Sequence, residues 1–169
     1  MGQRTDPRIV IVGRNWSNSQ ASVDEAFGLV NYLLSTGRTV VLILPMLNMD
    51  FDVSQRWIGE QRLAGRAIDN VTIPETPNLV FKTARDAIAV HVSRLNGNPR
   101  LITVDLLPHI CSAGLCSLVR GGQAMFRDSL HISNINADQY EPFFTAALHL
   151  ALRAQENRAE KPIKSISRP

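Results

Sequence analysis

The fold is decided by residues 8–45, where two short apolar runs, Arg8-Ile-Val-Ile-Val-Gly13 and Thr39-Val-Val-Leu-Ile-Leu-Pro45, flank a helical segment. Unbroken apolar runs of this length that end in Gly or Pro are typical of strands buried on both faces. Between them, apolar residues recur at helical spacing over 20–36, and Gly37 provides a C-cap. Two buried strands joined by a helix predict a parallel pair with a right-handed crossover.

The rest of the chain continues this α/β pattern. The elements expected from periodicity and turn residues are helices over 54–67 (with Ser54 as N-cap), 82–95 and 138–152, a strand over 101–104, a hairpin over 118–126 that turns on Gly121-Gly122, and a loop at Pro74 and Pro77. In the last helix we expect five residues to face inward: Tyr140, Phe143, Ala147, Leu148 and Ala151. The fold class expected is α/β, a three-layer α/β/α sandwich with at least three parallel strands.

Charge divides the chain into a neutral body and a basic tail. Residues 153–169 contain five positive and two negative side chains, which account for the whole net charge of +3. The expected domain, residues 7–152, is therefore neutral and has no electrostatic footprint for nucleic acid. The tail, with two prolines and few apolar residues, is expected to be disordered or to be a fragment end. No apolar run reaches the roughly 18–20 residues of a membrane helix, and residues 1–15 lack the order of a signal peptide.

A second informative stretch is Phe126-Arg-Asp-Ser-Leu-His-Ile-Ser133, ahead of the last helix. An Asp three residues before a His can orient that His as the general base of a serine nucleophile. The plain alternative is a loop His bonded to an Asp at the start of a helix. Upstream, Cys111 and Cys116 are either a disulfide, which requires an oxidising compartment, or two buried thiols.

Taken in order, these parts resemble the SGNH-type hydrolase domain fused to acyltransferase 3 membrane proteins, the O-acetylases of bacterial surface polysaccharides. The resemblance covers about residues 7–150. It includes the first strand running into Asn15-Trp-Ser17, the second strand, Phe51-Asp-Val53, the Cys pair and the Asp-x-x-His block, which is similar to the family's Tyr-x-Asp-x-x-His-Leu-Ser. The resemblance implies a flavodoxin-like SGNH fold that lacks its first strand or strands.

The resemblance also implies roles. His131 would be the general base and Asp128 its orienter, while Gly13 and Asn15 would donate to the oxyanion of a tetrahedral intermediate. The family's periplasmic setting favours a disulfide between Cys111 and Cys116 and a location at the periplasmic face of the inner membrane. The implied partners are an acylated glycan or acyl donor and a membrane acyltransferase domain, with no metal and no cofactor.

One sequence block that is typical of the family does not occur in these 169 residues. SGNH enzymes carry their serine in a Gly-Asp-Ser block, whereas the single Asp-Ser of this chain, Asp128-Ser129, lies inside the Asp-His block. We therefore expect either the C-terminal part of a longer enzyme, inactive alone, or a non-catalytic remnant or glycan-binding module. A nucleotide-binding domain is disfavoured, because neither Gly-x-Gly-x-x-Gly nor a Walker loop is present.

Other polar and aromatic residues have plainer interpretations. Asn15 could instead cap the following helix, and Trp16 is either a sugar-stacking platform or a buried anchor. His91 and His149 are expected to pack within helices, His109 to lie in a loop, and Asp105 to serve a turn. A zinc site formed by His109 and the two cysteines has suitable atoms but no recognised spacing.

Overall fold

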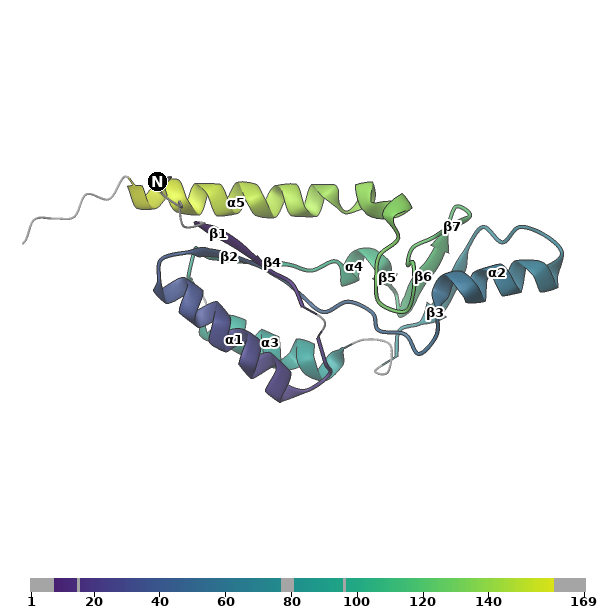
Figure 1. Cartoon of the computed structure of the whole chain (residues 1–169), viewed down its shortest axis with the longest axis horizontal. Helices are drawn as coiled ribbons and strands as arrows, with labels where there is room; N and C mark the ends of the chain where they lie inside the picture. The colour runs from purple at the N-terminus through teal and green to yellow at the C-terminus, as the bar shows by residue number, and fades with distance from the viewer. Residues whose placement is uncertain (1–7, 15, 77–80, 96, 160–169) are drawn as a thin grey trace, which may run out of the picture.

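The computed structural model of the chain describes residues 8–14, 16–76, 81–95 and 97–159. Within this part, the main sheet has three parallel strands in the order β1 (Ile9–Val12), β2 (Thr39–Ile43) and β4 (Leu101–Val104). Helices α1 (Gln20–Ser35) and α3 (Lys82–Arg94) cover one face, and α5 (Glu141–Ala159) covers the other (Figure 1). The predicted three-layer α/β/α sandwich is confirmed.

Successive side chains of the central strand point to opposite faces of the sheet, so the core lies in two layers. In β2, Val40 and Leu42 pack in the cluster formed with α1 and α3, while Val41 packs in the cluster that includes α5. Helix α1 begins where the Ser19 hydroxyl accepts a hydrogen bond from the N–H of Ser22 at 3.3 Å. The helix ends next to Gly37, whose φ of 86° places it in the left-handed region that glycine favours.

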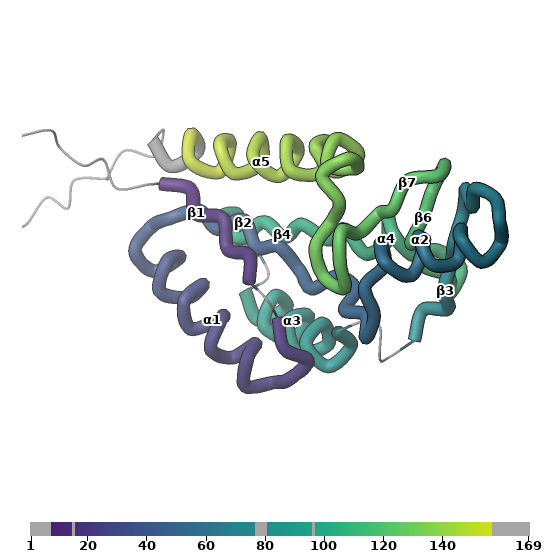
Figure 2. Tube along the Cα trace, turned by 45° about the vertical axis from the view of Figure 1, so that its right-hand side comes forward, coloured from purple at the N-terminus to yellow at the C-terminus, as the bar shows by residue number. Residues whose placement is uncertain are grey.

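A second sheet, antiparallel, lies beyond the carboxyl ends of the main strands (Figure 2). Its strands are β3 (Val71–Pro74), β5 (Cys111–Ser112), β6 (Leu115–Arg120) and β7 (Gln123–Ala124). The predicted hairpin is confirmed, since β6 and β7 turn on Gly121-Gly122, with φ of 56° and 71°. The loop predicted at Pro74 and Pro77 is wrong at Pro74, which ends β3, an outer strand, where a missing N–H is tolerated. Pro77 lies outside the described residues.

Helix α2 (Val53–Ala64) begins earlier than predicted, because the N-cap is Asp52 and not Ser54. Asp52 Oδ1 accepts a hydrogen bond from the N–H of Gln55 at 2.8 Å. Most of the helix is solvent-accessible: Leu63 is 91% exposed, and Val53 is the buried residue of the helix. A short helix, α4 (Leu107–Ile110), and a 3-10 helix, η1 (Asn134–Gln139), complete the described elements.

Helix α5 extends seven residues beyond the predicted end at Leu152, because residues 153–159 contain neither Pro nor Gly. Residues 160–169 lie outside the described part. The helix approaches β2 and β4 through the small side chains of Ala147 and Ala151. The larger Phe143 and Leu148 flank this contact and are each 37% exposed, and His149 is exposed, so the predicted packing of these three residues is wrong. Among the described residues, no helix combines the length and apolar character needed to cross a bilayer.

Candidate active site

The loop 126–132 holds the predicted base and its orienter in a closed backbone turn. The two ends of the loop form an antiparallel bridge, and the N–H of Arg127 donates to His131 O at 2.8 Å. Within the loop, Asp128 Oδ1 accepts hydrogen bonds from the N–H groups of Leu130, at 2.9 Å, and His131, at 2.8 Å. Asp commonly organises turns in this way. The backbone conformation therefore brings the carboxylate and the imidazole together.

The side chains of Asp128 and His131 form the predicted pair. His131 Nδ1 lies 3.0 Å from Oδ1 and 2.9 Å from Oδ2 of Asp128. Backbone hydrogen bonds from His131 and Leu130, helped by the imidazole, hold the pKa of Asp128 well below its usual range. An ionised carboxylate only accepts hydrogen bonds, so Nδ1 carries the proton in this pair and Nε2 of the neutral ring is the acceptor. Nε2 has no hydrogen-bond partner among the described residues, and the side chain is 65% exposed.

Contacts from the segment before α2 and from its first turn hold this loop in place. Ser54 Oγ lies 2.8 Å from the carbonyl oxygen of Arg127 and 2.8 Å from Asp52 Oδ1, and can donate to one of them at a time. The N–H of Met49 donates to the carbonyl oxygen of Ser129 at 3.1 Å. Sequence analysis identified Ser54 only as a helix cap, because nothing in local periodicity links it to a loop 73 residues away.

His131 borders a cavity of about 310 Å³ at the carboxyl ends of β1 and β2. Its lining residues are Gly13, Arg14, Trp16, Ile43, Leu44, Pro45, Met46, Leu47, Phe81, Leu130 and His131. Two predicted site residues, Gly13 and His131, are thus brought together from distant parts of the chain. Asn15 lies outside the described residues, so its oxyanion role stays a prediction, as does that of Gly13. Functional groups of α/β proteins are typically found at this edge of the sheet.

The segment after β1 is anchored against β2. Trp16 is 5% exposed, and its Nε1–H donates to Ile43 O at 3.2 Å, so the interpretation as a buried anchor is confirmed. A Cβ added at Gly13 would lie 3.3 Å from Ile43 Cδ1, which explains why a residue without a side chain suits this close approach. Arg14, which also lines the cavity, reaches α1, where its guanidinium lies 3.2 Å from the carboxylate of Glu25.

Within the described part of the chain, no serine lines this cavity. The Oγ atoms of Ser17 and Ser19 lie 3.0 Å apart near the start of α1. Ser129 sits inside the dyad loop but is not among the lining residues. The geometry therefore supplies a base and its orienter, and leaves the nucleophile unassigned among the described residues.

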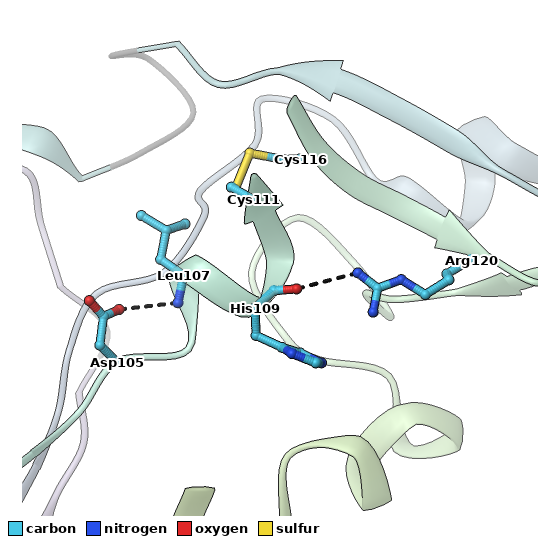
Figure 3. The surroundings of a disulfide bond; sticks show 6 residues. All are labelled: Asp105, Leu107, His109, Cys111, Cys116 and Arg120. Carbon is cyan, nitrogen blue, oxygen red and sulfur yellow. Dashed lines mark hydrogen bonds between the residues drawn. A yellow bond between two sulfur atoms is a disulfide. The ribbon is translucent and has the colours of Figure 1, made fainter. Parts of the chain in front are cut away.

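Cys111 and Cys116 are joined by a disulfide, with their Cα atoms 3.9 Å apart on the paired strands β5 and β6 (Figure 3). Both residues are buried. Because each sulfur is engaged in this bond, neither is a thiolate ligand for a metal ion. The described residues also contain no group of three or more His, Cys, Asp or Glu that could hold a metal.

Two further histidines, His91 and His109, pack against aromatic side chains. His91 Nε2 lies 2.8 Å from Asp24 Oδ1, and its ring stacks on Phe27 at 4.4 Å, which confirms the prediction of a packed, hydrogen-bonded residue. His109 is not in a loop as predicted. It lies in α4, half-buried, with its ring 5.6 Å from that of Tyr140, because Pro at the helix start favours a helical turn.

Asp105 has the predicted turn role and also an unpredicted partner. Its Oδ1 accepts a hydrogen bond from the N–H of Leu107 at 3.1 Å (Figure 3). Both carboxylate oxygens also contact the guanidinium of Arg85, at 3.0 and 2.5 Å. A bidentate pair of this kind fixes the orientation of both side chains.

Comparisons with known proteins agree with this architecture. The periplasmic domain of the lipopolysaccharide acetyltransferase of Salmonella ser. Paratyphi A has a similar fold, with a TM-score of 0.55 at 11% sequence identity. The likeness covers 85% of this chain and 56% of that one, so the chain spans little more than half of the solved domain. No curated protein matches the chain.

A family model, described as the SGNH domain fused to AT3 domains, matches residues 1–146. The match includes β1 and the following Gly13, the Cys pair and the loop that holds Asp128 and His131. Because it covers most of the chain and agrees with the observed fold, the chain belongs to the family of SGNH domains fused to AT3 domains.

Proposed function

We propose that this chain is part of a domain for acyl transfer or ester hydrolysis on a bacterial surface polysaccharide, with His131 as general base and Asp128 as its orienter. One observation carries the proposal: ionised Asp128 engages Nδ1 of His131, which leaves Nε2 free beside a cavity shared with Gly13. Membership of the SGNH family supports this reaction class. The similar fold of a domain named as a lipopolysaccharide acetyltransferase supports a glycan substrate.

In the proposed reaction, a serine oxygen attacks the ester carbonyl while Nε2 of His131 takes the hydroxyl proton. The imidazolium then protonates the departing alkoxide, and an acyl-serine remains. A sugar hydroxyl, for transfer, or water, for hydrolysis, next gives its proton to Nε2 and its oxygen bonds to the acyl carbon. The acyl–serine bond breaks, and the imidazolium returns the proton to the serine oxygen. We assign oxyanion stabilisation to the N–H of Gly13 and the amide of Asn15, where one such donor contributes about 3–4 kcal/mol in the transition state. This chemistry needs neither a metal nor a cofactor.

We place the nucleophile in a Gly-Asp-Ser block outside this sequence. No such block occurs in the 169 residues, and no described serine lines the cavity. Because the family's SGNH domain is fused to AT3 domains, we also propose a membrane acyltransferase domain as partner and acyl donor. The periplasmic domain of similar fold supports a location at the periplasmic face of the inner membrane.

The lack of a serine at the described cavity favours a second candidate, a non-catalytic SGNH-fold remnant or glycan-binding module. A coding sequence that continues upstream, in frame, through membrane helices and a Gly-Asp-Ser block would favour the enzyme.

The proposal is tested in the host cell by exchanging His131→Ala at the chromosomal locus and measuring ester-linked acyl groups on the surface polysaccharide by NMR. We expect these groups to be lost in His131→Ala. They should be unchanged in the matched control His149→Ala, whose side chain is exposed on α5. Acylation that persists in His131→Ala would exclude His131 as the base.

A further inference from the structure

A second and larger cavity, of about 560 Å³, lies beyond the end of β4. It is formed where the segment after β3, the first turn of α3, and α4 meet. Glu75, Thr76 and Asp86 contribute polar groups, and Leu107 and Pro108 contribute an apolar wall. Its volume is within the range of pockets for small organic ligands, about 300–1,000 Å³.

This cavity is next to the cavity that contains His131. Arg85 lines the larger cavity, and its guanidinium donates to the carbonyl oxygen of Pro45, a lining residue of the smaller one, at 2.7 Å. In the same way, Phe81 lines the smaller cavity and the following residue, Lys82, lines the larger. The linings of the two cavities are therefore in direct contact.

The walls of the larger cavity are fixed by interactions that do not depend on a ligand. Asp105 accepts a hydrogen bond from the N–H of Leu107 (Figure 3). It also holds Arg85 through two contacts, so α3 and the start of α4 are tied together. The backbone N–H of Glu75 donates to the carbonyl oxygen of Gly114 at 2.7 Å. Gly114 lies in the turn closed by the disulfide, and Cys111 itself lines the cavity. The backbone that carries these lining residues is therefore held in place without a ligand, which lowers the conformational entropy lost on binding.

The charges around the cavity disfavour an anion. Lys82 pairs with Asp86 at 2.7 Å, and Arg85 pairs with Asp105. The four charged lining residues, two acidic and two basic, sum to zero, and of these Glu75 has no ion-pair partner among the described residues. A carboxylate that faces a cavity accepts hydrogen bonds strongly, and hydroxyl groups are suitable donors. A sugar ring also presents C–H groups that can pack on Leu107 and Pro108.

We propose that this cavity binds an uncharged sugar unit of the acceptor glycan, with the Glu75 carboxylate accepting hydrogen bonds from sugar hydroxyls. This inference rests on the proposed function, because it takes the ligand to be a unit of the glycan on which that function acts. It also extends that function, since it selects neutral over acidic sugar units. An anionic group, such as a phosphate or a uronate, would be repelled by Glu75.

The test is an NMR titration of the purified chain. The probes are oligosaccharides from the host's surface polysaccharide, treated with mild base to remove ester groups and separated into neutral and acidic fractions, and inorganic phosphate. We expect the neutral fraction to shift the backbone resonances of Thr76, Lys82 and Asp86. Glu75→Gln, which keeps the size of the side chain and removes its charge, should weaken that binding about fivefold to tenfold. Glu156→Gln, an exposed position on α5, is the matched control and should bind as the parent chain does.

The inference is overturned if the neutral fraction shifts none of these resonances, if the acidic fraction or phosphate binds there instead, or if Glu75→Gln binds with unchanged affinity. Because His131 does not line this cavity, failure of the proposed function has a different outcome. Polysaccharide acylation would then persist in His131→Ala cells while saccharide binding to the purified chain remained intact.

Discussion

Reduction of the disulfide between Cys111 and Cys116 should destabilise the fold by an amount set by its small loop. The two cysteines are five residues apart, for which the chain-entropy relation gives about 2 kcal/mol. No cavity contribution adds to this value, because both residues are buried and a reduced thiol packs as a small apolar group. For a domain of this size, each kcal/mol lowers Tm by about 2–4 °C, so the expected decrease is about 4–8 °C.

The measurement is thermal unfolding followed by circular dichroism with and without a phosphine reductant, with free thiols counted in the same samples. The double variant Cys111→Ala/Cys116→Ala is the control, and its Tm should not respond to reductant. A parent chain whose two thiols are both free and whose Tm is unchanged would refute the entropic argument. It would mean that the hairpin turn alone keeps this loop closed in the unfolded chain.

Four further outcomes are expected. The isolated chain should hydrolyse p-nitrophenyl acetate only at background rate, with no change on His131→Ala, because a base without a nucleophile forms no acyl-enzyme; turnover abolished by that change would reveal a serine within the chain. Asp128→Asn should lower stability by about 1 kcal/mol at neutral pH. Since folding lowers the pKa of Asp128, the contribution of the ionised carboxylate to stability is complete above its ordinary pKa of about 4 and is lost as the pH falls below that value. The melting curves of the parent chain and of Asp128→Asn should therefore converge in acid. Ser54→Ala should increase amide exchange in the loop 126–132 while leaving α2 intact, and equal exchange would show that the 2.8 Å contact to Arg127 is dispensable. Ala113→Gly should raise stability by about 0.5–1 kcal/mol, because Ala113 has a φ of 50° that glycine adopts without strain, and a lower Tm would contradict this.

The parallel sheet and its helices could be predicted because the residues that specify each element are contiguous in the sequence. Each buried strand is a short apolar run, and the helices have Ser, Gly or Pro near their ends. The dyad could be predicted for the same reason: Asp128 and His131 are three residues apart, and the turn that joins them is made by the backbone of the same loop.

Contacts between distant segments could not be predicted in this way. Strand β3 is short and ends at a proline, so its local sequence favours a loop, and only pairing with β6 makes it a strand. Ser54 reaches Arg127 across 73 residues, and Arg85 reaches Asp105 across 20. The prediction of the inward-facing residues of helix α5 was wrong for another reason. Apolar periodicity identifies a helix face, but the close approach to the sheet selected its alanines and left Phe143 and Leu148 half exposed.

The second sheet gives the disulfide a role that its position in the sequence does not suggest. The bond closes the turn between β5 and β6, and the carbonyl of Gly114 in that turn positions the backbone of Glu75. The same sheet continues through β6 and β7, where the N–H of Met125 donates to Leu118 O, into the loop that holds Asp128 and His131. One small antiparallel sheet therefore supports both the proposed sugar cavity and the pair formed by Asp128 and His131. Loosening it at the disulfide should disturb the sugar cavity more than the pair, because Asp128 and His131 are held by hydrogen bonds within their own loop.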